Sequence, residues 1–113
     1  MAPLEIALRF MDIFFSGQDI ERLYEILADD LKFEGPFYRF DSSRDYIDSL
    51  LSDPPVGCEY KILQSFENGP CVNLIYEFSK PNICIQMSQL FEFRNNKITK
   101  VVLIFDTSKS IGK

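Results

Sequence analysis

Residues 83–94 follow a period of two in hydrophobicity, and this pattern constrains the fold more than any other feature of the chain. The odd positions are Ile83, Ile85, Met87, Gln89, Phe91 and Phe93, of which only Gln89 is polar. Such a period predicts a long β-strand with one buried face. A buried amide must find hydrogen-bond partners or cost about 1–3 kcal/mol. Gln89 therefore either orients a ligand in a cavity or bonds to Tyr60 or Tyr76 on neighbouring strands.

The N-terminal half has helical periodicity, and apolar residues cover more than half of the surface of its first segment. Proline suits a first helical turn, glycine a C-terminal stop and aspartate an N-cap. The expected elements are a helix from Pro3 to Gly17, a second helix capped by Asp19, a strand at residues 31–34, a capping box at residues 41–45 and a third short helix that ends before Pro54.

The C-terminal half consists of four strand patterns separated by Asn, Gly and Pro turns, which predicts an antiparallel meander. The expected strands are residues 58–67, 71–80, 83–94 and 97–106. In the first strand, we expect Tyr60, Ile62, Gln64 and Phe66 to share one face. The last strand is apolar on both faces, so both faces need cover, one from the helices and the other from a second subunit.

The sequence contains no histidine, which removes the commonest general base and a usual zinc or iron ligand. We therefore expect neither a metal nor a cofactor. The net charge of −5 disfavours nucleic acid, and no apolar run approaches the length of a membrane span. Three cysteines without a C-x-x-C pair are typical of reduced thiols, so we expect a cytoplasmic protein.

Three segments carry a family resemblance: Ser-Gly-Gln-Asp-Ile at 16–20, Leu-Ala-Asp-Asp-Leu-Lys-Phe-Glu-Gly-Pro at 27–36, and Phe-Asp-Ser-Ser-Arg-Asp-Tyr-Ile at 40–47. With the order of the elements, they resemble the nuclear transport factor 2-like (NTF2-like) superfamily, in its SnoaL-like and ketosteroid isomerase-like branch. The resemblance implies an α+β, cystatin-like fold, in which three N-terminal helices close the concave face of a cone-shaped, curved antiparallel sheet. It implies one domain over residues 1–107, followed by a flexible tail at 108–113.

The resemblance also allows the ketosteroid isomerase residues to be carried over one at a time. The general-base aspartate falls at Gly35, the oxyanion-hole tyrosine at Phe10 and the neutral oxyanion-hole aspartic acid at Gln89. That reaction needs a carboxylate to move the proton and an acidic donor for the enolate. These substitutions argue against ketosteroid isomerase chemistry.

The candidate ligand-binding residues are mostly aromatic side chains expected on the concave face of the sheet or the helices above it. They are Phe10, Phe14, Phe33, Tyr38, Tyr60, Tyr76, Met87, Gln89, Phe91 and Phe105, and Tyr46 could supply a further hydroxyl. Each could instead be ordinary core. Asp106 ends the last strand in a Phe-Asp pair similar to that of SnoaL-like chains. It is the first candidate for an acid or base, although a surface or capping aspartate is the commoner case.

Three functions fit these observations. The first is a homodimeric domain that binds a small, largely apolar molecule in the cone, oriented by Gln89 and one or two tyrosines. The second is a cofactor-free isomerase, cyclase or dehydratase of the SnoaL-like type. The third is an interaction domain whose cavity is filled by its own side chains. Leu63, Ile75 and Leu90 predict an apolar outer sheet face through which a dimer would form.

Overall fold

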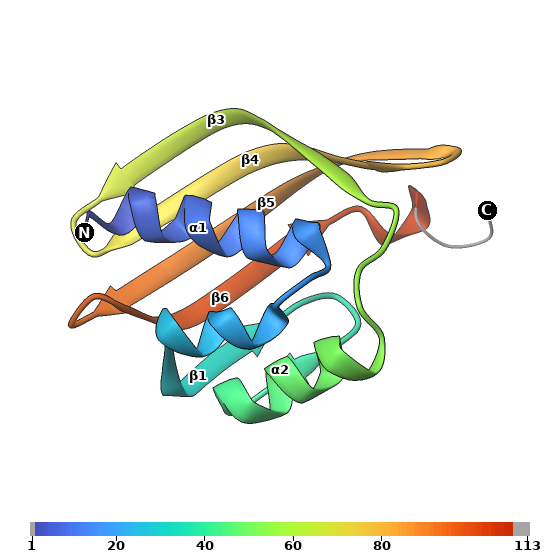
Figure 1. Cartoon of the computed structure of the whole chain (residues 1–113). Helices are drawn as coiled ribbons and strands as arrows, with labels where there is room; N and C mark the ends of the chain where they lie inside the picture. The colour runs from blue at the N-terminus through green and yellow to red at the C-terminus, as the bar shows by residue number, and fades with distance from the viewer. Residues whose placement is uncertain (1, 110–113) are drawn as a thin grey trace.

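The structure is a computed structural model that describes residues 2–109. Its elements follow one another from helices to long strands, as Figure 1 shows. In chain order they are α1 (Pro3–Ser16), the 3-10 helix η1 (Ile20–Glu25), β1 (Leu27–Glu34), β2 (Arg39–Phe40), α2 (Ser43–Ser52), β3 (Glu59–Asn68), β4 (Cys71–Lys80), β5 (Ile83–Arg94), β6 (Lys97–Phe105) and the short 3-10 helix η2 (Thr107–Lys109).

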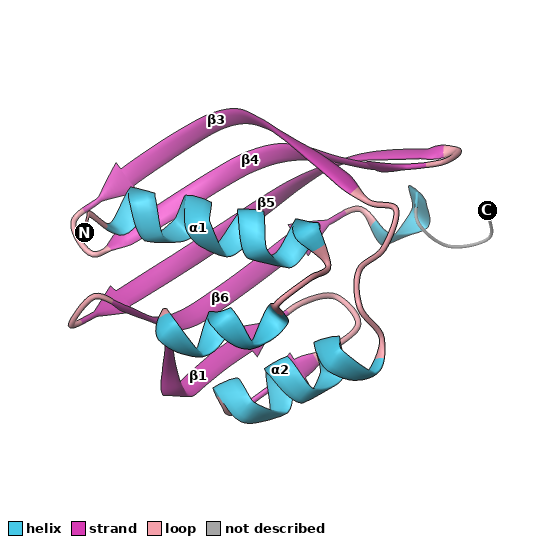
Figure 2. Ribbon diagram, viewed as in Figure 1, coloured by secondary structure: helices cyan, strands magenta, loops and turns pink. Residues whose placement is uncertain are grey.

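The six strands of the described residues form one curved, unclosed sheet in the order β2-β1-β6-β5-β4-β3. Strands β3 to β6 pair with their sequence neighbours in the predicted antiparallel meander. β1 lies parallel to β6, so the sheet is mixed at this one junction. The helices cover one face of the sheet (Figure 2). The α+β architecture implied by the resemblance is therefore confirmed.

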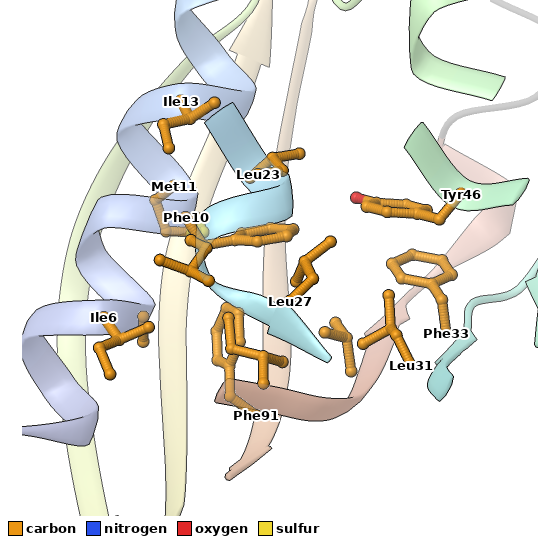
Figure 3. Packing of buried hydrophobic residues seen from close by; sticks show 14 of the residues in the cluster. Ile6, Phe10, Met11, Ile13, Leu23, Leu27, Leu31, Phe33, Tyr46 and Phe91 are labelled. Atoms are coloured by element: carbon orange, nitrogen blue, oxygen red, sulfur yellow. The ribbon is translucent and has the colours of Figure 1, made fainter. Parts of the chain in front are cut away.

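The helices close the concave face because their apolar sides meet the inward-facing residues of the sheet. α1 packs over β3 and β4, whereas η1 and α2 pack over β1. Phe10 on α1 meets Phe91 on β5 edge to face, with ring centroids 5.4 Å apart. Figure 3 shows this pair among the other buried side chains that α1, η1 and the sheet contribute. The core thus lies between the helices and the concave face.

The second helix differs from the prediction. It is a 3-10 helix, and Asp19 does not cap it, because its side chain makes no capping hydrogen bond. An N-cap residue normally has extended backbone, whereas Asp19 has a φ of 53°, in the left-handed region. Gly17 is also left-handed, with a φ of 67°, so the chain turns sharply between α1 and η1. By contrast, Ser42 caps α2 as predicted, since its Oγ accepts a hydrogen bond from the Asp45 amide at 3.0 Å.

β3 contains an irregularity that the sequence pattern did not predict. The register shifts between Ile62 and Gln64, so Tyr60 and Ile62 face the helices but Gln64 and Phe66 do not. Gln64 pairs with Ile75, and Phe66 pairs with Asn73, on the outer face. The prediction that these four side chains share one face was therefore wrong. One extra residue in a bulged strand reverses the direction of every later side chain.

The first strand begins earlier than predicted, and a short helix follows the last strand. β1 begins at Leu27, four residues before the predicted strand, because Leu27 pairs with Ile98 ahead of a register shift. Of the predicted tail, Ser108 and Lys109 belong to η2, and residues 110–113 lie outside the described residues. No helix within residues 2–109 combines the length and apolar character needed to cross a membrane.

We expect Phe91→Ala to lower the free energy of unfolding by about 3–5 kcal/mol, because it removes a fully buried ring and leaves a cavity. Phe37→Ala is the matched control, since Phe37 is half exposed, and it should cost less than half as much. Urea denaturation followed by circular dichroism measures both. Equal costs for the two variants would contradict the proposed position of the core.

Candidate functional site

An apolar cavity of about 90 Å³ lies between α1, α2 and the concave face, and we call it the inner compartment. Its walls are aromatic and aliphatic, and its side-chain amide comes from Gln89 at the centre of β5. The lining residues are Phe10, Met11, Phe14, Phe15, Phe33, Tyr46, Tyr76, Phe78, Met87, Gln89 and Leu103. The odd positions of β5 face the core, as their hydrophobic period predicted, and Gln89 at one of them places its amide at the wall of the cavity.

Gln89 is held by the neighbouring strand. Its side chain is 4% exposed, and its Oε1 accepts a hydrogen bond of 2.7 Å from the Tyr76 hydroxyl on β4. Within residues 2–109, the bond from Tyr76 is the hydrogen bond found for this side chain, and no fully buried side-chain nitrogen lacks a partner, so the Nε2 of Gln89 is accessible from the cavity. The Tyr76 bond fixes the amide so that its NH₂ group remains available as a double donor beside the cavity.

Tyr46 brings a second polar group to the same space from α2. The residue is 3% exposed, and its ring stacks on Phe33 with centroids 4.8 Å apart. Figure 3 shows its hydroxyl directed from α2 toward the side of the core that α1 covers. Among the described residues, no fully buried side-chain oxygen or nitrogen lacks a hydrogen-bond partner, and Tyr46 lines the inner compartment, so its hydroxyl, for which no bond within residues 2–109 is found, is accessible from the cavity. Tyr46 therefore offers a buried hydroxyl to whatever occupies the cavity.

Both tyrosine hydroxyls remain protonated at neutral pH. Burial raises the pKa of Tyr46 far above its usual value, and the nearby Tyr76 raises it further. Burial also raises the pKa of Tyr76. A hydroxyl with a raised pKa loses its proton less readily. The two groups are thus suited to donating hydrogen bonds rather than to exchanging protons with a substrate.

A second cavity of about 250 Å³, the outer compartment, adjoins the inner one. The two compartments share the lining residues Phe14, Phe33, Tyr46 and Leu103. The outer compartment is bordered by the loop between β1 and β2, which contributes Phe37 and Tyr38, and by the C-terminal end of α2. The two compartments therefore lie next to each other, on surfaces of the same four side chains.

The structure brings together eight of the ten residues in the predicted ligand set. Six line the inner compartment, namely Phe10, Phe14, Phe33, Tyr76, Met87 and Gln89. Tyr38 and Phe105 line the outer compartment. Tyr60 and Phe91 line neither. Tyr60 instead donates a hydrogen bond to the Asp12 carboxylate of α1, and Phe91 is packed fully in the core.

Asp106, the predicted acid or base, lies at a different place from both compartments. It is exposed, and its Oδ1 accepts hydrogen bonds from the backbone nitrogen and the hydroxyl of Ser108, at 3.0 and 2.7 Å. This is the geometry of an aspartate that stabilises a turn. Asp106 thus has the role of a capping aspartate, the alternative to an acid or base that the sequence left open.

Several lining residues were not in the predicted ligand set. They are Met11, Phe15, Tyr46, Phe78 and Leu103 of the inner compartment. Tyr46 carried a usable signal, because it lies on the apolar stripe of a short helix and has a hydroxyl. The other four side chains are apolar, so in the sequence they cannot be distinguished from core.

The inner compartment offers the Gln89 amide and the Tyr46 and Tyr76 hydroxyls as hydrogen-bonding groups. Among the described residues that line it there is no carboxylate, lysine or arginine. The positions that correspond to the ketosteroid isomerase groups, Phe10, Gln89 and Gly35, all line one of the compartments, and none of them carries an acid. The arrangement can hold a neutral acceptor, such as a carbonyl oxygen, but it lacks a base within reach.

Comparison with known proteins identifies the fold. No protein-family model matches the sequence, and no curated protein sequence matches it significantly. Among solved structures, an NTF2-like protein of unknown function from Cytophaga hutchinsonii superposes with a TM-score of 0.82 at 21% identity, covering 96% of this chain and 93% of that one.

Two further solved structures have names that refer to activities. A proposed SnoaL-like polyketide cyclase from Shewanella putrefaciens has a TM-score of 0.80 at 20% identity, covering 97% of this chain and 84% of that one. An epoxide hydrolase of the LEH-like type from M. tuberculosis has a TM-score of 0.71 at 24% identity, with coverages of 93% and 86%. The chain therefore has the NTF2-like fold, as the sequence resemblance implied.

We expect Tyr76→Phe to lower the free energy of unfolding by about 1–3 kcal/mol, because it leaves the buried Oε1 of Gln89 without its donor. Adding Gln89→Leu should recover part of this loss, since the unpaired group is then also removed. Tyr24→Phe, on a half-exposed ring, is the control and should change stability by less than about 0.5 kcal/mol. Strictly additive losses in the double variant would mean that the two side chains are not coupled.

Proposed function

We propose that this domain binds a small, largely apolar molecule in the two compartments between the helices and the concave sheet face. The supporting observation is that an aromatic-lined cavity has the Gln89 amide and the Tyr46 hydroxyl among the polar groups of its wall. Binding pockets are commonly apolar with a few convergent polar groups. A cavity filled by its own side chains, the third function considered from the sequence, fits this observation less well.

A bound molecule would place a hydrogen-bond acceptor in the inner compartment, beside Gln89. The Gln89 NH₂ group and the Tyr46 hydroxyl are both donors on the wall of the inner compartment, and an acceptor on the ligand would pair with them. A ketone, ester or ether oxygen has the required chemistry. The rest of the molecule would contact the surrounding rings, with Tyr76 acting only as the residue that positions Gln89.

Catalysis is the second candidate, because two proteins of the same fold are named for cyclase and epoxide hydrolase activities. A cofactor-free isomerase, cyclase or dehydratase needs a group that moves a proton. Among the described residues that line either compartment, the carboxylate is that of Asp53, at the outer one. Binding is therefore favoured over turnover. The cytoplasmic location inferred from the sequence stays a prediction.

Leu103→Trp tests the proposal, because Leu103 lines both compartments and a larger side chain there would occupy space that the ligand needs. Acetophenone, an apolar ketone, is a suitable probe in an NMR titration. We expect it to shift the side-chain amide signals of Gln89 in the wild type, and to bind at least about tenfold more weakly to Leu103→Trp.

Ile104→Trp is the matched control, since Ile104 is the next residue and lies on the opposite face of the sheet. It should leave acetophenone binding unchanged. Gln89→Leu should weaken binding about fivefold to tenfold, the order expected for a hydrogen bond of about 1 kcal/mol or slightly more. If acetophenone leaves the signals of the cavity residues unperturbed in the wild type, the binding proposal is wrong.

We also propose that the outer face of the sheet forms a homodimer. Two adjacent rows of paired residues on that face contain the apolar side chains of Phe66, Leu90, Val102, Ile75 and Ile104, with the uncharged polar residues Gln64, Asn73 and Ser88 between them. Ile104 is 61% exposed, and Leu63 is also exposed beside them. The register shift in β3 enlarges this surface, because it adds Phe66. An apolar face of this kind is typical of a surface that another chain covers.

Sedimentation equilibrium at micromolar concentration tests the dimer. We expect the wild type to sediment as a dimer and Ile104→Lys as a monomer, because a charge in the middle of the apolar face would be buried without a partner. Leu51→Lys, on an exposed leucine of α2, is the control and should remain dimeric. A monomeric wild type would count against this interface.

A further inference from the structure

The outer compartment has an unusually aromatic wall. Seven of its thirteen lining residues are phenylalanine or tyrosine. Two of them are strongly exposed at the surface: Phe37 is 50% exposed and Tyr38 is 66% exposed. Exposed rings gathered around one hollow would gain free energy by contacting a ligand. The aromatic wall therefore indicates a binding surface in addition to the inner compartment.

The rings at this mouth hold one another in place. Tyr38 stacks on Phe40 with centroids 6.3 Å apart and an interplanar angle of 20°. Phe37 packs edge to face against Phe105, with centroids 5.8 Å apart. Because each ring has an aromatic neighbour on one side, much of the remaining surface of Phe37 and Tyr38 is accessible to a ligand.

The charge at this compartment is negative. Asp53, at the end of α2, is the charged residue among the described residues that line it, and no salt bridge neutralises its carboxylate within residues 2–109. Glu34 and Arg39 nearby form an ion pair of 3.8 Å with each other. Asp53 is exposed, so its carboxylate remains hydrated, and its negative charge would attract a cation bound beside it.

We propose that the outer compartment binds a small organic cation, an alkylated ammonium group attached to the apolar part of the ligand. The faces of aromatic rings attract such cations, and a nearby carboxylate adds an opposite charge. The overall charge of −5 favours the approach of a cation. This inference rests on the proposed function, since it specifies one end of the molecule that the two compartments would hold.

A pair of matched probes tests the charge alone. Choline chloride and 3,3-dimethylbutan-1-ol have nearly the same shape, and a neutral carbon in the alcohol replaces the ammonium nitrogen of choline. We expect choline to bind the wild type about twofold to thirtyfold more tightly than the alcohol, the range that a cation–π contribution supplies. NMR titration of the aromatic signals of Phe37 and Tyr38 measures both affinities.

Three variants test whether Asp53 and Tyr38 cause the preference for choline over the alcohol. Asp53→Asn and Tyr38→Leu should each reduce the preference for choline over the alcohol by at least about half. Asp48→Asn changes the net charge of α2 by the same amount at a residue that lines neither compartment, so the preference should be unchanged. Circular dichroism of each variant verifies that it is folded, and Tyr38→Leu tests the site independently if Asp53→Asn is unstable.

Binding of choline, the alcohol and acetophenone distinguishes failure of the cation site from failure of the proposed binding function. Equal affinities for the two probes, or a preference for choline that persists in both Asp53→Asn and Tyr38→Leu, would overturn the cation site. If acetophenone still bound at the inner compartment, the general binding proposal would stand. If none of the three probes bound, both proposals would fall together.

Discussion

The hydrogen bond between Tyr76 and Gln89 is the interaction on which the site depends. It allows a polar side chain to lie on the buried face of the central strands, because the Oε1 of Gln89 has its donor on the next strand. It also sets the direction of the amide, so that the NH₂ group lies toward the inner compartment. Without this bond, an apolar residue would suit the position better, and the tyrosine hydroxyls of Tyr46 and Tyr76 would be the polar groups left in the lining.

The rings around the cavity explain how a space can persist in so small a domain. Phe33 and Tyr46 stack on each other, and Phe10 stacks on Tyr46 with centroids 6.3 Å apart, so these flat side chains support one another. A rigid ring cannot fold into a gap as a flexible chain such as methionine can. The strands curve beneath them, and α1 and α2 lie above. The hollow is thus a consequence of how large, stiff side chains pack between a curved sheet and helices.

The sequence predicted most of the elements but not the details that set their directions. The period of two in β4 and β5 is unbroken, so both strands were predicted with their observed bounds. The register shift after Ile62 left no mark in the pattern, because Gln64 and Phe66 fit either face. The parallel pairing of β1 with β6 joins segments far apart in the chain, which local patterns cannot report. Gln89 was identifiable as the one polar residue on an apolar face, and Tyr46 as a possible hydroxyl, but the stacking of Tyr46 on Phe33 depends on the position of α2.

Xenon provides the most direct test of the central claim, which is that an open apolar space lies beside Gln89. Xenon atoms enter empty apolar cavities of proteins without needing any hydrogen bond. Crystals of the protein held under xenon pressure should show xenon density between Phe10, Tyr76 and Met87, the side chains that line the inner compartment. Density confined to other places, with these side chains in mutual contact, would show that the cavity is filled and would contradict the account.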